Sequence, residues 1–77
     1  MSGRPVKHSV TLRGHRTSIS LEDDFWLALR ALAAEQDLAL NALVSRIDAD
    51  RGIEIGLASA IRVYVLRELQ GRIPRAG

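Results

Sequence analysis

The chain has 77 residues, a hydrophobic fraction of 47%, a formal net charge of +2 and no cysteine. This length suits one small domain, near the size at which oligomerisation often supplies missing burial. The lack of cysteine excludes disulfides and thiolate metal sites. No apolar run is long enough to cross a bilayer or to serve as a signal peptide. We therefore expect a cytoplasmic protein without a membrane partner.

The net positive charge of the chain lies in its first twenty residues. This stretch contains no acid, and its basic residues and histidines are Arg4, Lys7, His8, Arg13, His15 and Arg16. The rest of the chain has more acids than bases. A basic segment on a near-neutral body is typical of proteins that bind a polyanion.

Residues 16–21 alternate in the manner of a short strand. Thr17, Ile19 and Leu21 lie on one side, and Arg16, Ser18 and Ser20 lie on the other. A strand needs a partner for its backbone N–H and C=O groups. That partner is either the preceding segment, folded back as a hairpin, or the same strand of another copy.

Residues 9–13 also alternate, with Val10 and Leu12 on one side. Their apolar parity is even, whereas that of residues 16–21 is odd. Gly14 lies at the change and could serve a hairpin turn, or a bulge or kink in one longer strand. We expect residues 1–8 to form a flexible basic arm.

Three helices are expected from the helical spacing of the apolar residues. Their expected ranges are 21 or 22 to 36, 40 or 41 to about 51, and about 57 to 70, with a flexible tail at 71–77. Ser20 and Asp23 resemble a weak capping box, so Ser20 is either the N-cap or an outward strand residue. The break at residues 37–39 lacks the glycine that best suits a left-handed C-cap.

The run 14–22, followed by Phe25-Trp26, Ile47-Asp48 and the run 59–62, resembles small bacterial proteins of the ribbon-helix-helix superfamily. The resemblance implies a mostly α fold in which one N-terminal strand pairs antiparallel across an intertwined homodimer. The third helix is an addition to that minimal fold, and we place the whole domain at residues 9–70. The superfamily inserts its two-stranded ribbon into the DNA major groove.

The resemblance and the charge pattern together assign roles to individual residues. DNA base contacts are expected from Arg16, Ser18 and Ser20. Phosphate contacts are expected from Arg4, Lys7, Arg13 and His15, and from the backbone amides of Leu40, Asn41 and Ala42 at a helix N-terminus. The dimer core is expected to contain Thr17, Ile19, Leu21, Phe25, Leu29, Leu43, Val44 and Ile47.

The sequence also suggests roles for Asp37, Asp48, Arg62 and the two histidines. Asp37 stands where many relatives have glycine, and an acid near the phosphate clamp could weaken it. Asp48 is expected to pair with Arg46, Arg51 or Arg62, and Arg62 to be solvated or paired with Glu68 or Asp48. The two histidines are seven residues apart without a fixed acid, which is a poor metal site.

These features favour a homodimeric, sequence-specific DNA-binding protein that acts as a transcriptional regulator such as a repressor, with or without further assembly of dimers along DNA. We expect no cofactor and no enzymatic activity, because the sequence lacks a nucleophile–base pair, a set of metal ligands and a phosphate-binding loop. The alternative is a protein-interaction or antitoxin-like module with the same dimeric fold. A DNA binder should lose affinity steeply with salt, whereas an interaction module should not.

Overall fold

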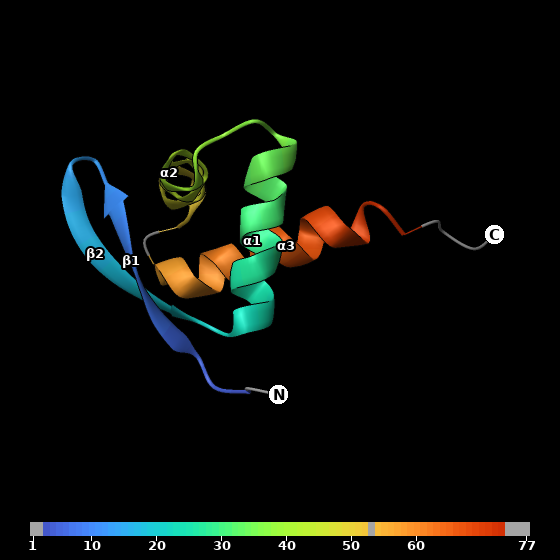
Figure 1. Ribbon diagram of the computed structural model, residues 1–77, viewed down its shortest axis with the longest axis horizontal. Helices are drawn as coiled ribbons and strands as arrows, with labels where there is room; N and C mark the ends of the chain where they lie inside the picture. The colour runs from blue at the N-terminus through green and yellow to red at the C-terminus, as the bar shows by residue number, and fades with distance from the viewer. Residues whose placement is uncertain (1–2, 53, 74–77) are drawn as a thin grey trace.

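The computed structural model describes residues 3–52 and 54–73 of the chain. In chain order it contains strands β1 (Val6–Leu12) and β2 (His15–Leu21) and helices α1 (Asp23–Glu35), α2 (Leu40–Asp50) and α3 (Leu57–Gln70). The two strands form a sheet on one side of the helices (Figure 1). The three predicted helices are confirmed, and the third has the predicted bounds.

β1 and β2 form an antiparallel hairpin within the chain, in a register that pairs Leu12 with His15. Arg13 and Gly14 make the turn between them, and both have positive φ, 52° and 80°. Positive φ at both turn residues is required by the type I′ turn, whose twist matches that of paired strands. Of the alternatives left open by the sequence, the hairpin is therefore the observed one.

The turn also explains why the apolar parity changes between the two strands. Each even-numbered residue of β1 pairs with an odd-numbered residue of β2. Val10 of β1 therefore lies on the same face as Ile19 and Leu21 of β2. The three side chains are 3%, 5% and 0% exposed, respectively, so this face packs on the helices.

Two expectations about the N-terminal segment are revised by the hairpin. Residues 6–8, expected in the flexible arm, belong instead to β1, which begins at Val6 and pairs this residue with Leu21. Residues 1–2 of the expected arm lie outside the described residues. The expected single N-terminal strand is in fact the second of two. One edge of β2 is occupied by β1 of the same chain, because the Arg13-Gly14 turn brings the preceding segment back alongside it.

The ends of α1 differ from those expected. The N-cap is Glu22 and makes no side-chain capping hydrogen bond, so of the two alternatives for Ser20 the strand residue is the observed one. At the other end Asp37 has φ 55°. The N–H of Asp37 donates to Ala34 O over 3.1 Å, and that of Leu38 donates to Ala33 O over 2.9 Å. This is a Schellman motif in which an aspartate takes the left-handed position that glycine usually fills.

One hydrophobic core joins the inner face of the hairpin to all three helices. It comprises Val10, Ile19, Leu21, Leu29, Leu32, Ala33, Leu43, Val44, Ile47, Ile61 and Val65. Six residues expected in a dimer core are therefore buried within one chain. The other two differ, since Phe25 is half-buried and Thr17 is exposed. Ile61 and Val65 of α3 are buried in the same core, so α3 supplies part of the burial that was expected from a second copy.

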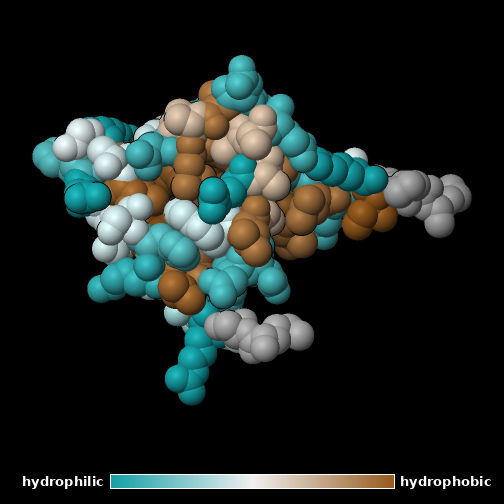
Figure 2. All heavy atoms as spheres, viewed as in Figure 1, coloured by the Kyte–Doolittle hydropathy of each residue, from teal (hydrophilic) through white to brown (hydrophobic). Residues whose placement is uncertain are grey.

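Large apolar side chains are exposed mainly in the last third of the described chain. Figure 2 shows apolar atoms across the middle of the molecule and on toward its C-terminal end. The exposed large apolar side chains are Val6, Leu27, Ile55, Val63, Leu66, Leu69 and Ile73. None of the helices in residues 3–52 and 54–73 is long and apolar enough to cross a membrane.

Candidate functional site

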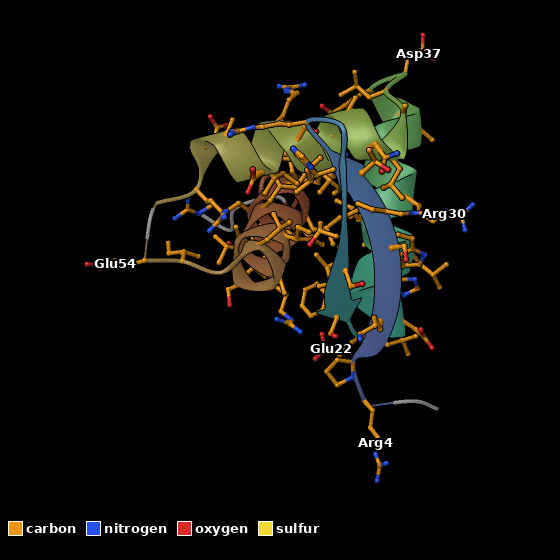
Figure 3. The ribbon with its side chains drawn as sticks, turned by 90° about the vertical axis from the view of Figure 1, so that its left-hand side faces the viewer. Arg4, Glu22, Arg30, Asp37 and Glu54 are labelled. Carbon is orange, nitrogen blue, oxygen red and sulfur yellow. The ribbon has the colours of Figure 1, made fainter. Side chains whose placement is uncertain are left out.

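The outward face of the hairpin carries the residues that alternate with the buried ones. These are Lys7, Ser9 and Thr11 of β1 and Arg16, Ser18 and Ser20 of β2, all exposed. Across the sheet they pair as Lys7–Ser20, Ser9–Ser18 and Thr11–Arg16. In Figure 3 the hairpin is seen from this side, in front of the helices. The three predicted base-contact residues thus lie together on one exposed strip.

This outward face combines two cations with four hydroxyls and contains no carboxylate. Lys7 lies toward the open end of the hairpin and Arg16 near the turn, so the two positive charges stand at opposite ends. A guanidinium can form paired hydrogen bonds with two acceptors, and a hydroxyl can donate or accept one. The face is suited to an anionic surface that carries many hydrogen-bond acceptors.

The outer edge of β2 has backbone groups directed away from β1. Thr11 of β1 donates its N–H to Asn41 Oδ1 over 3.2 Å, so this N–H does not point toward Arg16, its partner on β2. Hydrogen-bonding direction alternates along antiparallel strands. The N–H and C=O groups of Arg16, Ser18 and Ser20 are therefore directed to the outer edge. Such an edge is a template for pairing with another strand.

Arg62 of α3 contacts this edge near the start of α1. Its Nη2 donates to Ser20 O over 3.3 Å, and its Nε donates to Glu22 Oε1 over 2.8 Å. The hydrogen bond from Arg62 lowers the pKa of the Glu22 carboxyl below its ordinary value. The guanidinium also lies 5.9 Å from the centre of the Phe25 ring. The expectation that Arg62 is solvated or paired with Asp48 or Glu68 is wrong, because the fold brings α3 to the junction of β2 and α1.

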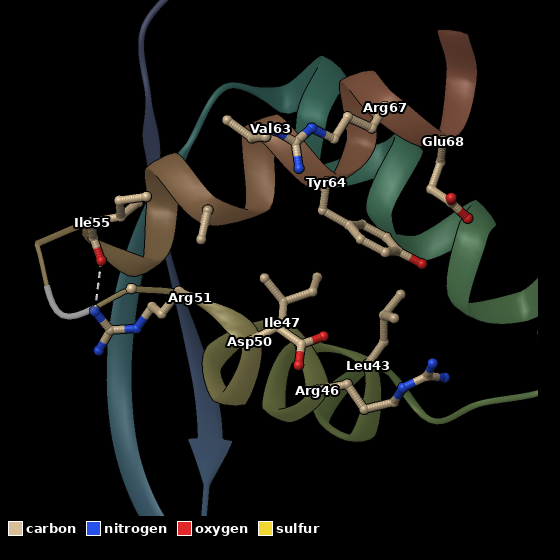
Figure 4. A pocket seen from close by; sticks show the side chains of 12 residues that line it. Leu43, Arg46, Ile47, Asp50, Arg51, Ile55, Val63, Tyr64, Arg67 and Glu68 are labelled. Carbon is tan, nitrogen blue, oxygen red and sulfur yellow. Dashed lines mark hydrogen bonds between the residues drawn. The ribbon is translucent and has the colours of Figure 1, made fainter. Parts of the chain in front are cut away.

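The turn of the hairpin is held against the C-terminal half of α2. Arg13 Nη2 lies 3.8 Å from Asp48 Oδ2, although its side chain is 73% exposed. Asp48 also accepts a 2.6 Å hydrogen bond from Arg51 Nε, and Arg51 Nη1 donates to Ile55 O over 2.6 Å (dashed line in Figure 4). The predicted pairing of Asp48 with Arg51 is confirmed. Arg13 remains accessible for a second anionic partner.

The N-terminus of α2 lies beside the outer edge of β1. The N-cap residue Ala39 makes no side-chain capping hydrogen bond, and the first N–H that binds back to it is that of Leu43. The amides of Leu40, Asn41 and Ala42 thus precede the first hydrogen bond of the helix. Through its bond to Thr11, the Asn41 side chain brings these three predicted phosphate-contact residues next to the hairpin.

The two histidines lie at different ends of the hairpin. His8 stacks on Trp26 with ring centroids 3.8 Å apart and an interplanar angle of 5°. Its Nε2 is buried without a hydrogen-bond partner among the described residues. His15 is exposed beside the turn. Among the described residues no group of three histidine, cysteine, aspartate or glutamate side chains is placed to hold a metal.

A groove of 360 Å³ lies between α2 and α3 (Figure 4). Its apolar lining includes Leu43, Ile47 and Val63, while Arg46, Asp50, Arg67 and Glu68 stand around it. The Tyr64 hydroxyl in its wall accepts a 2.7 Å hydrogen bond from Gln36 Nε2.

Sequence reasoning missed three features of this region. It placed Ser9 and Thr11 on the side opposite Val10 but did not name either among the contact residues. It gave no hint that His8 stacks on Trp26, because the two residues belong to separate elements. It also could not foresee the contact of Arg62 with Ser20, which lies 42 residues away in the chain.

A family described as ribbon-helix-helix domain matches residues 5–69 of the chain. The matched range covers both strands, α1, α2, all of α3 but its last residue, and the outward face of the hairpin. No curated protein and no solved structure is similar enough to the chain to be matched.

Proposed function

Because this chain belongs to the ribbon-helix-helix domain family, we propose that it is a homodimeric, sequence-specific DNA-binding protein that regulates transcription. Domains of this family are commonly DNA-binding regulators. The observation that carries the proposal is the outward face of the hairpin. It presents Arg16, Ser18 and Ser20 on an exposed, acid-free strip beside a second strand.

Two copies of the chain would pair through the outer edge of β2. This edge directs the backbone groups of Arg16 and Ser18 away from the chain's own sheet, which supports the proposal. The most favourable register places Ser18 opposite Ser18 of the second copy. Each Arg16 then faces a serine, whereas a slip that placed the two arginines opposite each other would bring like charges together.

The paired β2 strands would enter the major groove, which admits a two-stranded ribbon. Arg16 is the principal reading residue, because its guanidinium can bind guanine O6 and N7 together. One such pair is worth about 1–3 kcal/mol of discrimination against a wrong base. Ser18 and Ser20 would add hydrogen bonds of lower selectivity. The Ser20 carbonyl, which accepts a hydrogen bond from Arg62 in the single chain, would accept one from the second copy instead.

Phosphate contacts would fix the dimer on the duplex without reading its sequence. We assign them to Arg4, Lys7, Arg13 and His15, and to the backbone amides of Leu40, Asn41 and Ala42. The three amides have the geometry of a helix N-terminus, which favours anions. Asp37 is close to them in the chain and would oppose the phosphate, so Asp37→Asn should strengthen binding.

The test is fluorescence anisotropy of the protein on a duplex selected from a random pool, beside a scrambled duplex, at two salt concentrations. We expect tight, salt-sensitive binding to the selected duplex that Arg16→Ala reduces at least tenfold. Arg30→Ala is the matched control. Arg30 is an exposed arginine of α1, and its side chain projects sideways, away from the hairpin (Figure 3). If no duplex is enriched, or both arginine variants weaken binding equally, the proposal is refuted.

Sedimentation of the free protein tests the dimer separately. A species of twice the chain mass at micromolar concentration supports pairing, and a monomer at that concentration contradicts it. The exposed apolar side chains of α3, Val63, Leu66 and Leu69, favour a second function as a protein-interaction module. That function would be supported by a dimer that binds neither duplex even at low salt.

A further inference from the structure

Because strand β1 pairs with β2, this chain has a wider DNA-facing sheet than a single strand per copy would give. We propose that β1 lies against the sugar–phosphate backbone at the wall of the major groove, with Lys7, Ser9 and Thr11 as its contacts. The inference rests on the proposed function. In the dimer the sheet would have four strands, with the two β2 strands in the centre and one β1 on each side.

The width of such a sheet decides where β1 lies. Neighbouring strands are spaced by about 4.8 Å, so the two outer strands of a four-stranded sheet are about 14 Å apart. The major groove is about 12 Å wide. The central pair of strands therefore fits between the walls, and the outer strands coincide with the walls. The walls of the groove are the two phosphate backbones.

The outward side chains of β1 match this position chemically. Lys7 offers an ammonium, and Ser9 and Thr11 offer hydroxyls, on the face that also carries Arg16. An ammonium is a point charge that binds phosphate without demanding a planar partner, and hydroxyls often bind phosphate oxygens. None of the three side chains has the forked donor or amide group that reads a base edge in two places.

The fold holds β1 firmly enough for this role. Val10 is 3% exposed in the core, and His8 is stacked on Trp26 of α1. At the outer edge Asn41 binds the Thr11 N–H. Inner face and edge are thus both anchored, so the outward side chains keep a fixed offset from those of β2. Strand β1 and the N-terminus of α2 would then meet the same backbone.

The experiment measures how log K falls with log[salt] for the dimer on the selected duplex. Each phosphate neutralised contributes about 0.9 to this slope, so Lys7→Gln, which acts in both copies, should reduce the slope by about 1.8. The base preference should stay the same. Thr11→Val, which replaces a hydroxyl by a methyl group, should weaken binding with the slope unchanged. Arg30→Gln makes the same change of charge away from the sheet and should leave the slope as it is.

The outcomes separate this inference from the function on which it rests. If Arg16→Ala weakens specific binding but Lys7→Gln leaves the slope unchanged, β1 is off the DNA and the inference fails alone. If Lys7→Gln changes the preferred sequence, β1 lies within the groove and the inference also fails. If the unaltered protein prefers no duplex, the proposed function fails first.

Discussion

Asp37 occupies a backbone conformation that disfavours an aspartate, and Asp37→Gly should stabilise the protein. Its φ of 55° lies in the left-handed region, where the Cβ of an L-residue is crowded by the following carbonyl. Its side chain is exposed and points away from the molecule (Figure 3). The substitution therefore removes no core contact and keeps the two backbone hydrogen bonds that close the end of α1.

The magnitude follows from two opposing effects. A non-glycine residue in the left-handed region costs about 1–2 kcal/mol, and glycine gives back about 0.5–1 kcal/mol through the greater freedom of the unfolded chain. The net stabilisation is then about 0.5–1 kcal/mol. For a domain of this size it should raise the Tm by about 2–8 °C.

Urea and thermal unfolding of four proteins test this reasoning. Asp37→Asn removes the charge and keeps a residue that tolerates positive φ, so it isolates electrostatics. Asp37→Ala removes the charge and increases the strain, because alanine tolerates positive φ less well than aspartate. We expect the glycine variant to be the most stable and the alanine variant to be less stable than the aspartate protein. Equal stability of the glycine and alanine variants would refute the conformational argument.

Three further substitutions test other parts of the fold. Arg13→Asn should stabilise the protein by about 0.5–1 kcal/mol in urea unfolding, because asparagine accepts positive φ more easily than arginine. A lower urea midpoint in the variant would contradict this. Ile61→Ala should cost about 2–5 kcal/mol if α3 completes the core; a loss below 1 kcal/mol would place α3 outside it. Since Arg62 lowers the pKa of Glu22, their ion pair stabilises the fold above pH 4.5 and is lost as the pH falls through the lowered pKa. In Glu22→Gln the free energy of unfolding should therefore fall less steeply as the pH drops below 4.5. The same pH dependence in the variant and the unaltered protein would contradict this.

The sequence predicts the faces of the elements better than their partners. Alternation separates Arg16, Ser18 and Ser20 from the buried Ile19 and Leu21, because side chains on a strand point to opposite faces whatever the strand pairs with. The bounds of α3 follow from helical spacing for the same local reason. These predictions need no knowledge of the tertiary fold.

The hairpin could not be predicted with equal strength. Arg13-Gly14 lacks the asparagine or aspartate that usually begins a type I′ turn. Arg13 nevertheless takes positive φ, and the hairpin that it closes buries Val10 in the core shared with the helices. The apolar residues of α3 likewise form one face that is too wide for a single small neighbour to cover. Only the tertiary structure shows that Ile61 and Val65 are buried while Val63 and Leu66 are exposed.

The central claim is that two copies of the chain join along β2, and engineered cysteines test it most directly. The chain has no cysteine of its own. In the proposed register the two copies of residue 18 form a hydrogen-bonded pair with Cα atoms about 5.5 Å apart, within the range of a disulfide. The two copies of residue 9 would be about 14 Å apart, which is too far.

The measurement is the rate of interchain disulfide formation in Ser18→Cys and Ser9→Cys under mild oxidation. Both positions are exposed on the same face of the hairpin and pair with each other across it. We predict rapid, complete linkage of Ser18→Cys into a dimer, while Ser9→Cys stays unlinked. Equal rates for the two variants, or faster linkage of Ser9→Cys, would show that β2 does not join the two copies.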